Sequence, residues 1–96
     1  MIDHLVLFAV KEDASETEIE DLLSSLKALK EKIASVVDFS VGEDFSGRAG
    51  DYTHALFVRF EDRDGLQEYL GHPEHLAVVE KLDAHTSGRL VADYEF

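Results

Sequence analysis

Two short segments of this sequence carry apolar side chains on both faces of a predicted β-strand. In residues 2–10, Val6 and Phe8 share one face, yet Leu7 on the opposite face is also apolar. Residues 52–60 repeat the pattern. A strand that is open to water on one side should alternate between apolar and polar side chains. These two strands therefore need a packed layer on each face.

The order of the predicted elements indicates what covers the first of these faces. Ser15 and Glu18 form a capping-box pattern ahead of a long amphipathic helix, and Asp62 suits the start of another. The full order is strand 2–10, helix 15–33, strand 37–42, strand 52–60, helix 62–71, a helix from Pro73 to near His85, and strand 89–96. It predicts one α+β domain over residues 1–96 with a ferredoxin-like β-α-β-β-α-β order, an antiparallel four-stranded sheet, and helices on one face.

No helix remains to cover the other face of the sheet. The helix that begins at Pro73 is expected to use its narrow apolar stripe of Leu76, Val79 and Leu82 on the first face. A large uncovered apolar surface is normally an interaction site. We therefore expect a homodimer, a dimeric α/β barrel in which two sheets face each other and bury at least ~1,000 Å².

Composition excludes several classes of partner and chemistry. Twenty-one acidic and nine basic residues give a net charge of −12, which repels nucleic acid and anionic membrane surfaces. There is no apolar run long enough to cross a bilayer and no signal-peptide pattern, so we expect a cytoplasmic protein. The chain has no cysteine, which excludes disulfides and thiolate chemistry.

Two histidines lie inside predicted strands, among apolar neighbours. By alternation, His4 shares a face with Val6, and His54 shares a face with Leu56. Each is either a core histidine that hydrogen-bonds to a neighbour or a wall of a binding pocket inside the barrel, between the two facing sheets. The two interpretations are equally weighted by the sequence.

The densest group of chemically useful side chains is the segment from Tyr69 to His75. His75 is a candidate general base, because the pKa of imidazole lies near neutrality, and Tyr69 is a candidate hydrogen-bond donor to an oxyanion. His72 is a candidate binding residue. On spacing alone the favoured alternative is structural, with His72 closing a helix break and His75 solvated in the first helical turn.

A metal site in the same segment is not favoured. His72 and His75 are three positions apart, with Glu74 between them, whereas the helical zinc motif has its histidines four apart. Pro73 also interrupts the segment. We therefore predict neither a metal nor a cofactor.

The sequence resembles the stress-responsive A/B barrel (Dabb) family over nearly its full length. The resemblance is carried, in the right order, by His4-Leu5-Val6-Leu7-Phe8, Val41-Gly42-Glu43-Asp44, Gly50-Asp51-Tyr52-Thr53-His54, the segment from Tyr69 to His75, and Asp93-Tyr94. It implies the same dimeric α/β barrel. The family contains a plant polyketide cyclase, stress-related plant proteins and many bacterial proteins of unknown role, so membership alone does not fix a function.

The resemblance also implies roles for individual residues. Tyr69 and His75 match the catalytic tyrosine and histidine of the plant cyclase, and His4 and His54 match its pocket histidines. Leu26 departs from the pattern, because the cyclase has a tyrosine there, so the same substrate is not expected.

Two functions follow as hypotheses. The first is a cofactor-free cyclase or lyase acting on a small β-ketone or polyketide-like compound, with His75 as base and Tyr69 as oxyanion donor. The alternative is a non-catalytic, stress-related binding or structural dimer. A cofactor-independent monooxygenase has no motif here beyond the fold.

Overall fold

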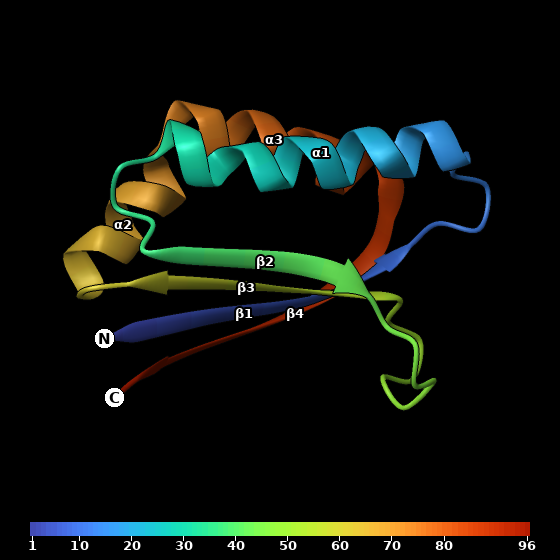
Figure 1. Cartoon of the computed structure of the whole chain (residues 1–96). Coiled ribbons are helices and arrows are strands. Elements are labelled where there is room, and N and C mark those ends of the chain that lie inside the picture. The colour runs from blue at the N-terminus through green and yellow to red at the C-terminus, as the bar shows by residue number, and fades with distance from the viewer.

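The computed structural model describes all 96 residues and has the predicted order of elements (Figure 1). The strands are β1 (Ile2–Val10), β2 (Asp38–Glu43), β3 (His54–Phe60) and β4 (Thr86–Glu95), and the helices are α1 (Glu16–Lys32), α2 (Arg63–Gly71) and α3 (Pro73–His85). No helix is long and apolar enough to cross a membrane. The prediction of a ferredoxin-like α+β fold is confirmed.

The four strands form one antiparallel sheet in the order β2-β3-β1-β4. The first and last strands of the chain are therefore neighbours, and both termini lie at the same end of the sheet (Figure 1). The amino group of Met1 donates to the carbonyl oxygen of Phe96 at 2.9 Å. This pairing places residues from the two ends of the chain side by side.

The helix starts follow the sequence signals. The Ser15 hydroxyl accepts from the backbone N–H of Glu18, whose side chain accepts from the Ser15 backbone N–H in return. The Asp62 carboxylate caps α2 by accepting from the N–H of Gly65 at 2.9 Å. Each cap satisfies N–H groups that have no partner within the helix.

The core lies between the helices and the face of the sheet beneath them (Figure 1). Leu22 and Leu29 of α1 are fully buried, as are Val58 and Phe60 of β3. The spacing of seven positions between the two leucines places them two helical turns apart on one face. The even-numbered side chains of β1 complete the core from the sheet.

One residue of the apolar stripe predicted on α3 is wrong, whereas Leu82 is buried as expected. The stripe expected on α3 included Leu76, but that side chain is 52% exposed, and the buried residues are Val78 and Leu82. At 100° per residue, Leu76 lies about 200° around the helix from Val78. Because Val78 and Leu82 share the face that meets the core, Leu76 points away from it.

Two strands begin two or three residues away from the predicted positions. The N–H of Tyr52 bonds to the carbonyl oxygen of Ala49 in a turn, so β3 begins at His54. At the other end of the chain, Thr86 ends α3 by donating from its backbone N–H and its hydroxyl to the carbonyl oxygen of Leu82. Thr86 then adopts an extended backbone, so β4 begins before Gly88.

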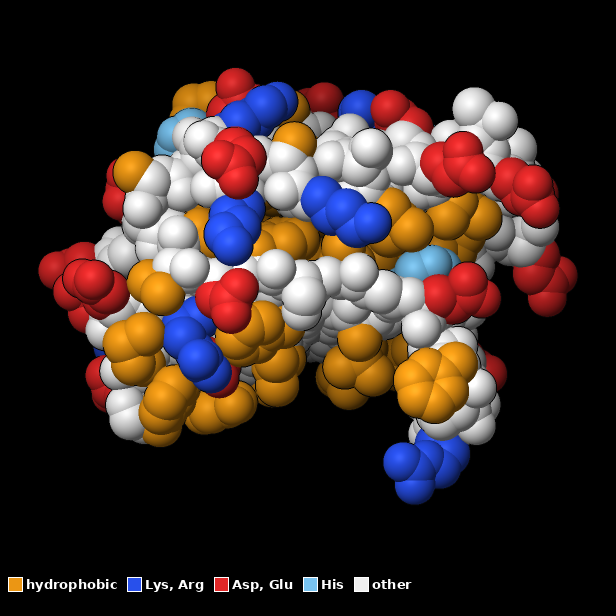
Figure 2. Space-filling model, in the orientation of Figure 1, with side chains coloured by type: hydrophobic (Ala, Val, Ile, Leu, Met, Phe, Trp, Pro, Cys, Tyr) orange, Lys and Arg blue, Asp and Glu red, His pale blue; other side chains and the backbone are white.

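The face of the sheet opposite the helices is uncovered within one chain. Hydrophobic side chains gather along this side in Figure 2, below the sheet. They include Leu5 and Leu7 of β1, which are half-buried, and Leu90 of β4, which is 56% exposed and lies opposite Leu7 in the strand register. We call this surface the open sheet face.

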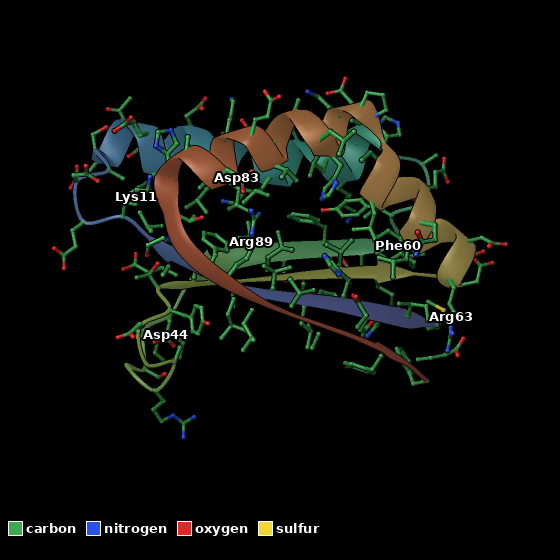
Figure 3. The ribbon with its side chains drawn as sticks, turned by 180° about the vertical axis from the view of Figure 1, so that it is seen from behind. Lys11, Asp44, Phe60, Arg63, Asp83 and Arg89 are labelled. Atoms are coloured by element: carbon green, nitrogen blue, oxygen red, sulfur yellow. The ribbon has the colours of Figure 1, made fainter.

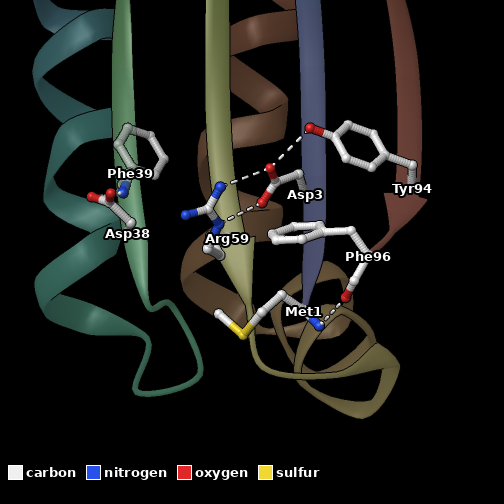
Figure 4. A network of polar contacts seen from close by, with 7 residues as sticks. All are labelled: Met1, Asp3, Asp38, Phe39, Arg59, Tyr94 and Phe96. Carbon is white, nitrogen blue, oxygen red and sulfur yellow. Dashed lines mark hydrogen bonds and ion pairs between the residues drawn. The ribbon is translucent and has the colours of Figure 1, made fainter.

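A polar network at one end of the open sheet face explains why two charged residues interrupt its apolar pattern (Figure 4). The Arg59 guanidinium donates to both carboxylate oxygens of Asp3 at 2.7 and 2.9 Å, and the Tyr94 hydroxyl donates to the same carboxylate at 3.0 Å. The hydrogen bond from Arg59 lowers the pKa of Asp3. Arg59 also packs 5.1 Å from the ring centroids of both Phe57 and Phe96.

Candidate functional site

A cavity of about 300 Å³, lined in part by His4, lies between the helix-facing side of the sheet and α3. The expectation that the histidine-lined pocket lies on the other side, between two facing sheets, is therefore wrong for His4. Ten of its 14 lining residues are hydrophobic, counting Tyr69 for its ring, so the cavity suits a ligand with an apolar body. The apolar walls include Val6 and Phe8 of β1, Leu26 of α1, Leu56 of β3, and Val78 and Leu82 of α3. The polar groups that converge on it are His4, Tyr69, His75, Arg89 and Asp93.

Tyr69 and His75 reach the cavity from the two sides of a break between helices. Tyr69 lies near the end of α2, and His75 lies in the first turn of α3. Pro73 occupies the first position of α3, where its missing N–H costs no hydrogen bond. This break brings the two rings together, with their centroids 4.3 Å apart.

The imidazole of His75 lines the cavity and has one nitrogen held by the backbone. Its Nδ1 lies 3.1 Å from the carbonyl oxygen of Leu70, and because a carbonyl oxygen only accepts, Nδ1 donates. In the neutral ring, Nε2 is then the atom with a free lone pair. Burial lowers the pKa of His75, although the hydrogen bond to Leu70 opposes this shift. At neutral pH the ring is therefore uncharged and able to accept a proton.

The phenol of Tyr69 lines the cavity with its hydroxyl unpaired within the chain. Its side chain is buried against Phe60, with ring centroids 5.2 Å apart, and burial raises its pKa well above the usual value of 10.0. The hydroxyl therefore keeps its proton at neutral pH. None of the hydrogen bonds within the chain uses this hydroxyl, so it remains free to donate to a ligand.

His4 also faces the cavity, and it has a partner. Its Nδ1 lies 2.5 Å from the Oδ1 of Asp93, the residue that pairs with it across the β1–β4 ladder. Its ring centroid is 6.0 Å from that of Tyr69. The carboxylate fixes the ring orientation and directs Nε2 away from Asp93.

His54 is buried but does not line this cavity. Its ring stacks on Phe8, with centroids 5.1 Å apart, and its Nδ1 lies 2.7 Å from the hydroxyl oxygen of Thr53. Burial lowers its pKa. Of the two interpretations left open by the sequence, this geometry matches a core histidine with a neighbouring hydrogen-bond partner.

His72 caps α3 and also lies outside the cavity wall. Its Nδ1 accepts from the backbone N–H of Glu74 at 3.1 Å. That bond commits one ring nitrogen to the helix start, as in the structural alternative for this residue. No group of three or more His, Asp or Glu side chains in the chain is placed to hold a metal ion.

Sequence reasoning missed two polar residues of the cavity, Arg89 and Asp93. Both lie on β4 and face the helices, with Val91 between them on the same side. The sequence feature that could have identified them is the alternation of side chains along β4. Leu90, Ala92 and Tyr94 point onto the open sheet face, so Arg89 and Asp93 point to the other side. The pattern becomes informative only once β4 is known to lie beside β1.

We compared the sequence of this chain with models of protein families. The model of the Stress Responsive A/B Barrel Domain (Dabb) matches residues 2–96. This chain belongs to the stress-responsive A/B barrel family. The family resemblance expected from the sequence is thereby confirmed, and it covers every element that forms the cavity.

Other stress-responsive A/B barrel proteins are similar to this chain. A stress-response A/B barrel domain-containing protein of Arabidopsis thaliana is 32% identical over 83 residues, which cover 84% of this chain. The match spans only 31% of that plant protein, which is therefore much longer. Olivetolic acid cyclase of Cannabis sativa is 25% identical over 95 residues, covering 97% of this chain and 94% of the cyclase.

A solved structure supports the same arrangement of the stress-responsive A/B barrel. It is described as a dimeric protein of unknown function with a ferredoxin-like fold, from Bacteroides fragilis. It is 28% identical to this chain with a TM-score of 0.84, and the match covers 99% of this chain and 95% of the other.

Proposed function

We propose that this chain forms a homodimeric α/β barrel that binds a small β-ketone or polyketide-like compound and catalyses its cyclisation or cleavage without a cofactor. The observation that carries the proposal is the pairing of Tyr69 and His75 at the cavity, with ring centroids 4.3 Å apart. One ring offers an uncharged base and the other a protonated hydroxyl. These are the two groups that enolisation of a ketone requires.

The reaction begins with proton transfer from a carbon next to a carbonyl group. Nε2 of His75 takes the proton, and the electron pair of the broken C–H bond moves onto the carbonyl oxygen, which becomes an enolate. The Tyr69 hydroxyl donates a hydrogen bond to that oxygen as its charge develops. In a cyclisation, the enolate carbon then bonds to a second carbonyl carbon of the same molecule, and the imidazolium returns the proton to the new alkoxide. Each contribution is typically worth about 10²-fold or more in rate.

The cavity supports a substrate with an apolar body. Its wall is mostly aliphatic, and its polar groups are few and convergent, as in small-molecule sites generally. The similarity to olivetolic acid cyclase supports carbonyl chemistry of this class. Leu26, which lines the cavity, makes this part of the wall apolar and supports a substrate different from that of the cyclase.

The homodimer is supported by the open sheet face and by the similar Bacteroides fragilis protein described as dimeric. Leu90, Tyr94 and Phe96 are each about half exposed or more on that side of β4 and its C-terminal end. A second copy would remove this apolar surface from water, which is favourable in proportion to the apolar area buried.

Deuterium exchange tests the proton transfer. Benzoylacetone carries an acidic CH₂ group between two carbonyls, and its exchange in deuterated water is followed by NMR with and without protein. We expect the wild-type chain to accelerate exchange, His75→Ala to abolish the acceleration, and Tyr69→Phe to reduce it by about 10²-fold. His85→Ala is the matched control, because His85 lies at the far end of α3 beside Glu18 and outside the cavity. Unchanged exchange in His75→Ala would reject the role of His75 as base.

A second candidate function is a non-catalytic, stress-related binding dimer. The similarity to the longer Arabidopsis thaliana protein, whose name refers to a stress response and a barrel domain but to no reaction, favours it. In this case a neutral ketone would bind in the cavity without accelerated exchange, and Tyr69→Phe would change the binding affinity but no rate.

A further inference from the structure

Arg89 is the only lysine or arginine among the residues that line the cavity. It lies opposite Phe8 in the β1–β4 register, on the helix-facing side of β4. Figure 3 shows its side chain rising from β4 toward α3. The one acidic residue of the wall, Asp93, is held by His4 rather than by Arg89. The cavity therefore contains a cation that no other cavity residue neutralises.

The partner of Arg89 lies outside the cavity and holds it weakly. The guanidinium pairs with the carboxylate of Asp83 on α3, which is 59% exposed and does not line the cavity (Figure 3). Exposed ion pairs contribute little stability because water screens them. This is the only hydrogen bond of the Arg89 side chain within the chain, and a guanidinium has five N–H donors. Donors therefore remain for a ligand.

Arg59 provides the internal comparison. It uses two N–H donors on both oxygens of the buried Asp3 carboxylate and packs between two aromatic rings. That arrangement satisfies the guanidinium structurally. Arg89 has neither a bidentate partner nor an aromatic neighbour of this kind. Its contacts within the chain therefore do not account for a guanidinium at this position.

Arg89 lines the same cavity as Tyr69 and His75, so the three side chains can meet one ligand. Its positive charge contributes to the lowered pKa of His75, after burial and the charge of His4. The net charge of −12 repels anions at long range. A local cation such as Arg89 would offset this repulsion at the cavity.

We propose that Arg89 binds the carboxylate of a substrate whose ketone lies at Tyr69 and His75, which makes the substrate class a keto acid with an apolar body. The inference rests on the proposed function, because it places the ketone at the proposed base and donor. The ligand carboxylate takes a bidentate position on the guanidinium, either beside Asp83 or in its place. In either position the negative charge of Asp83 opposes the binding of the ligand carboxylate.

Calorimetric titration with two matched probes tests the assignment. Benzoylpropionate carries a ketone, a phenyl ring and a carboxylate, and benzoylpropionamide replaces the carboxylate with a neutral amide. We expect the wild-type chain to bind the carboxylate about tenfold more tightly or better. Arg89→Met keeps the length of the side chain but removes its charge, and it should eliminate the preference. Asp83→Asn should tighten carboxylate binding several-fold and leave amide binding unchanged.

The outcomes separate this inference from the proposed function. Equal binding of the two probes by the wild-type chain, a preference that survives in Arg89→Met, or no binding of either probe would overturn the role of Arg89. His75→Ala should keep the preference for the carboxylate while losing deuterium exchange of the bound ketone. If deuterium exchange does not depend on His75 but the preference for the carboxylate probe still depends on Arg89, the anion site is supported and the role of His75 as base is rejected.

Discussion

The Nδ1 of His4 lies 2.5 Å from the Oδ1 of Asp93, although 89 positions separate the two residues in the chain. The β1–β4 ladder brings them together and places both at the cavity. His4 is almost fully buried, so its ring needs this partner. The contact ties the last strand to the first at the site that we propose to be functional.

Asp93→Asn should therefore lower the free energy of unfolding by about 1 kcal/mol, because it removes a charge-assisted hydrogen bond to a buried ring. The Asp93 side chain is 40% exposed, which limits the loss. Glu95→Gln is the matched control on the same strand, since Glu95 makes only an exposed pair with Arg63. Urea unfolding should show a change of less than about 0.5 kcal/mol for that control. Equal losses in the two variants would contradict a special role for the His4 contact.

The rate of the proposed proton transfer should depend on pH through His75. The base must be uncharged, and burial lowers its pKa below the usual 6.5. The rate should therefore fall at acidic pH with a midpoint below 6.5, as Nε2 becomes protonated, and reach a plateau once the ring is fully deprotonated. A rate profile whose acid limb has its midpoint above 6.5 would exclude His75 in this environment.

The same shift affects stability with a defined sign. Between the lowered pKa of folded His75 and the ordinary pKa of the unfolded chain, the unfolded state binds more protons. The free energy of unfolding should therefore rise with pH through this window and gain nothing further from His75 above it. His54, whose pKa burial also lowers, adds in the same direction. Melting temperatures measured across the window should depend less on pH in His75→Ala than in the wild-type chain.

Leu90→Glu should convert the proposed dimer to monomers, because it places a charge on the open sheet face opposite Leu7. Leu76→Glu is a closely matched control, since Leu76 is 52% exposed and Leu90 56%, but Leu76 lies on α3. Sedimentation should give the dimer mass for wild type and Leu76→Glu, and a lower mass for Leu90→Glu. A monomeric wild-type chain at micromolar concentration would remove the dimer proposal.

Leu22→Ala should destabilise the fold by about 2–5 kcal/mol, because Leu22 is fully buried in the core and its removal leaves a cavity. Leu23→Ala, one position along α1, should cost clearly less, since Leu23 is only partly buried at the edge of the core. Chemical unfolding of the two variants measures the difference. Similar losses would show that the two leucines are equally buried in solution.

Much of the fold could be predicted from local patterns. The capping signals at Ser15 and Asp62 and the proline at position 73 mark helix starts correctly, because capping involves residues only two or three positions apart. The face of α3 could not be predicted from the same kind of evidence. Several apolar residues were available in that helix, and only packing against the core selected Val78 over Leu76.

Some residues of the candidate site could likewise be predicted from the sequence, and others could not. Tyr69 and His75 are six positions apart across a proline break, so the sequence alone was enough to identify them as a group. Alternation predicted that His4 and His54 each share a strand face with apolar residues, but it did not predict that the helices cover this face. Only the tertiary structure separates these two histidines, because position along a strand decides which of them reaches the cavity.

The sequence by itself determined the order of the elements, the helix starts and the need to cover both faces of the sheet, because these depend on local hydrogen bonding and on side-chain alternation. The tertiary structure alone decided that Arg89 and Asp93 join the cavity. Their placement depends on the pairing of β4 with β1, a contact between the two ends of the chain whose register no local pattern specifies.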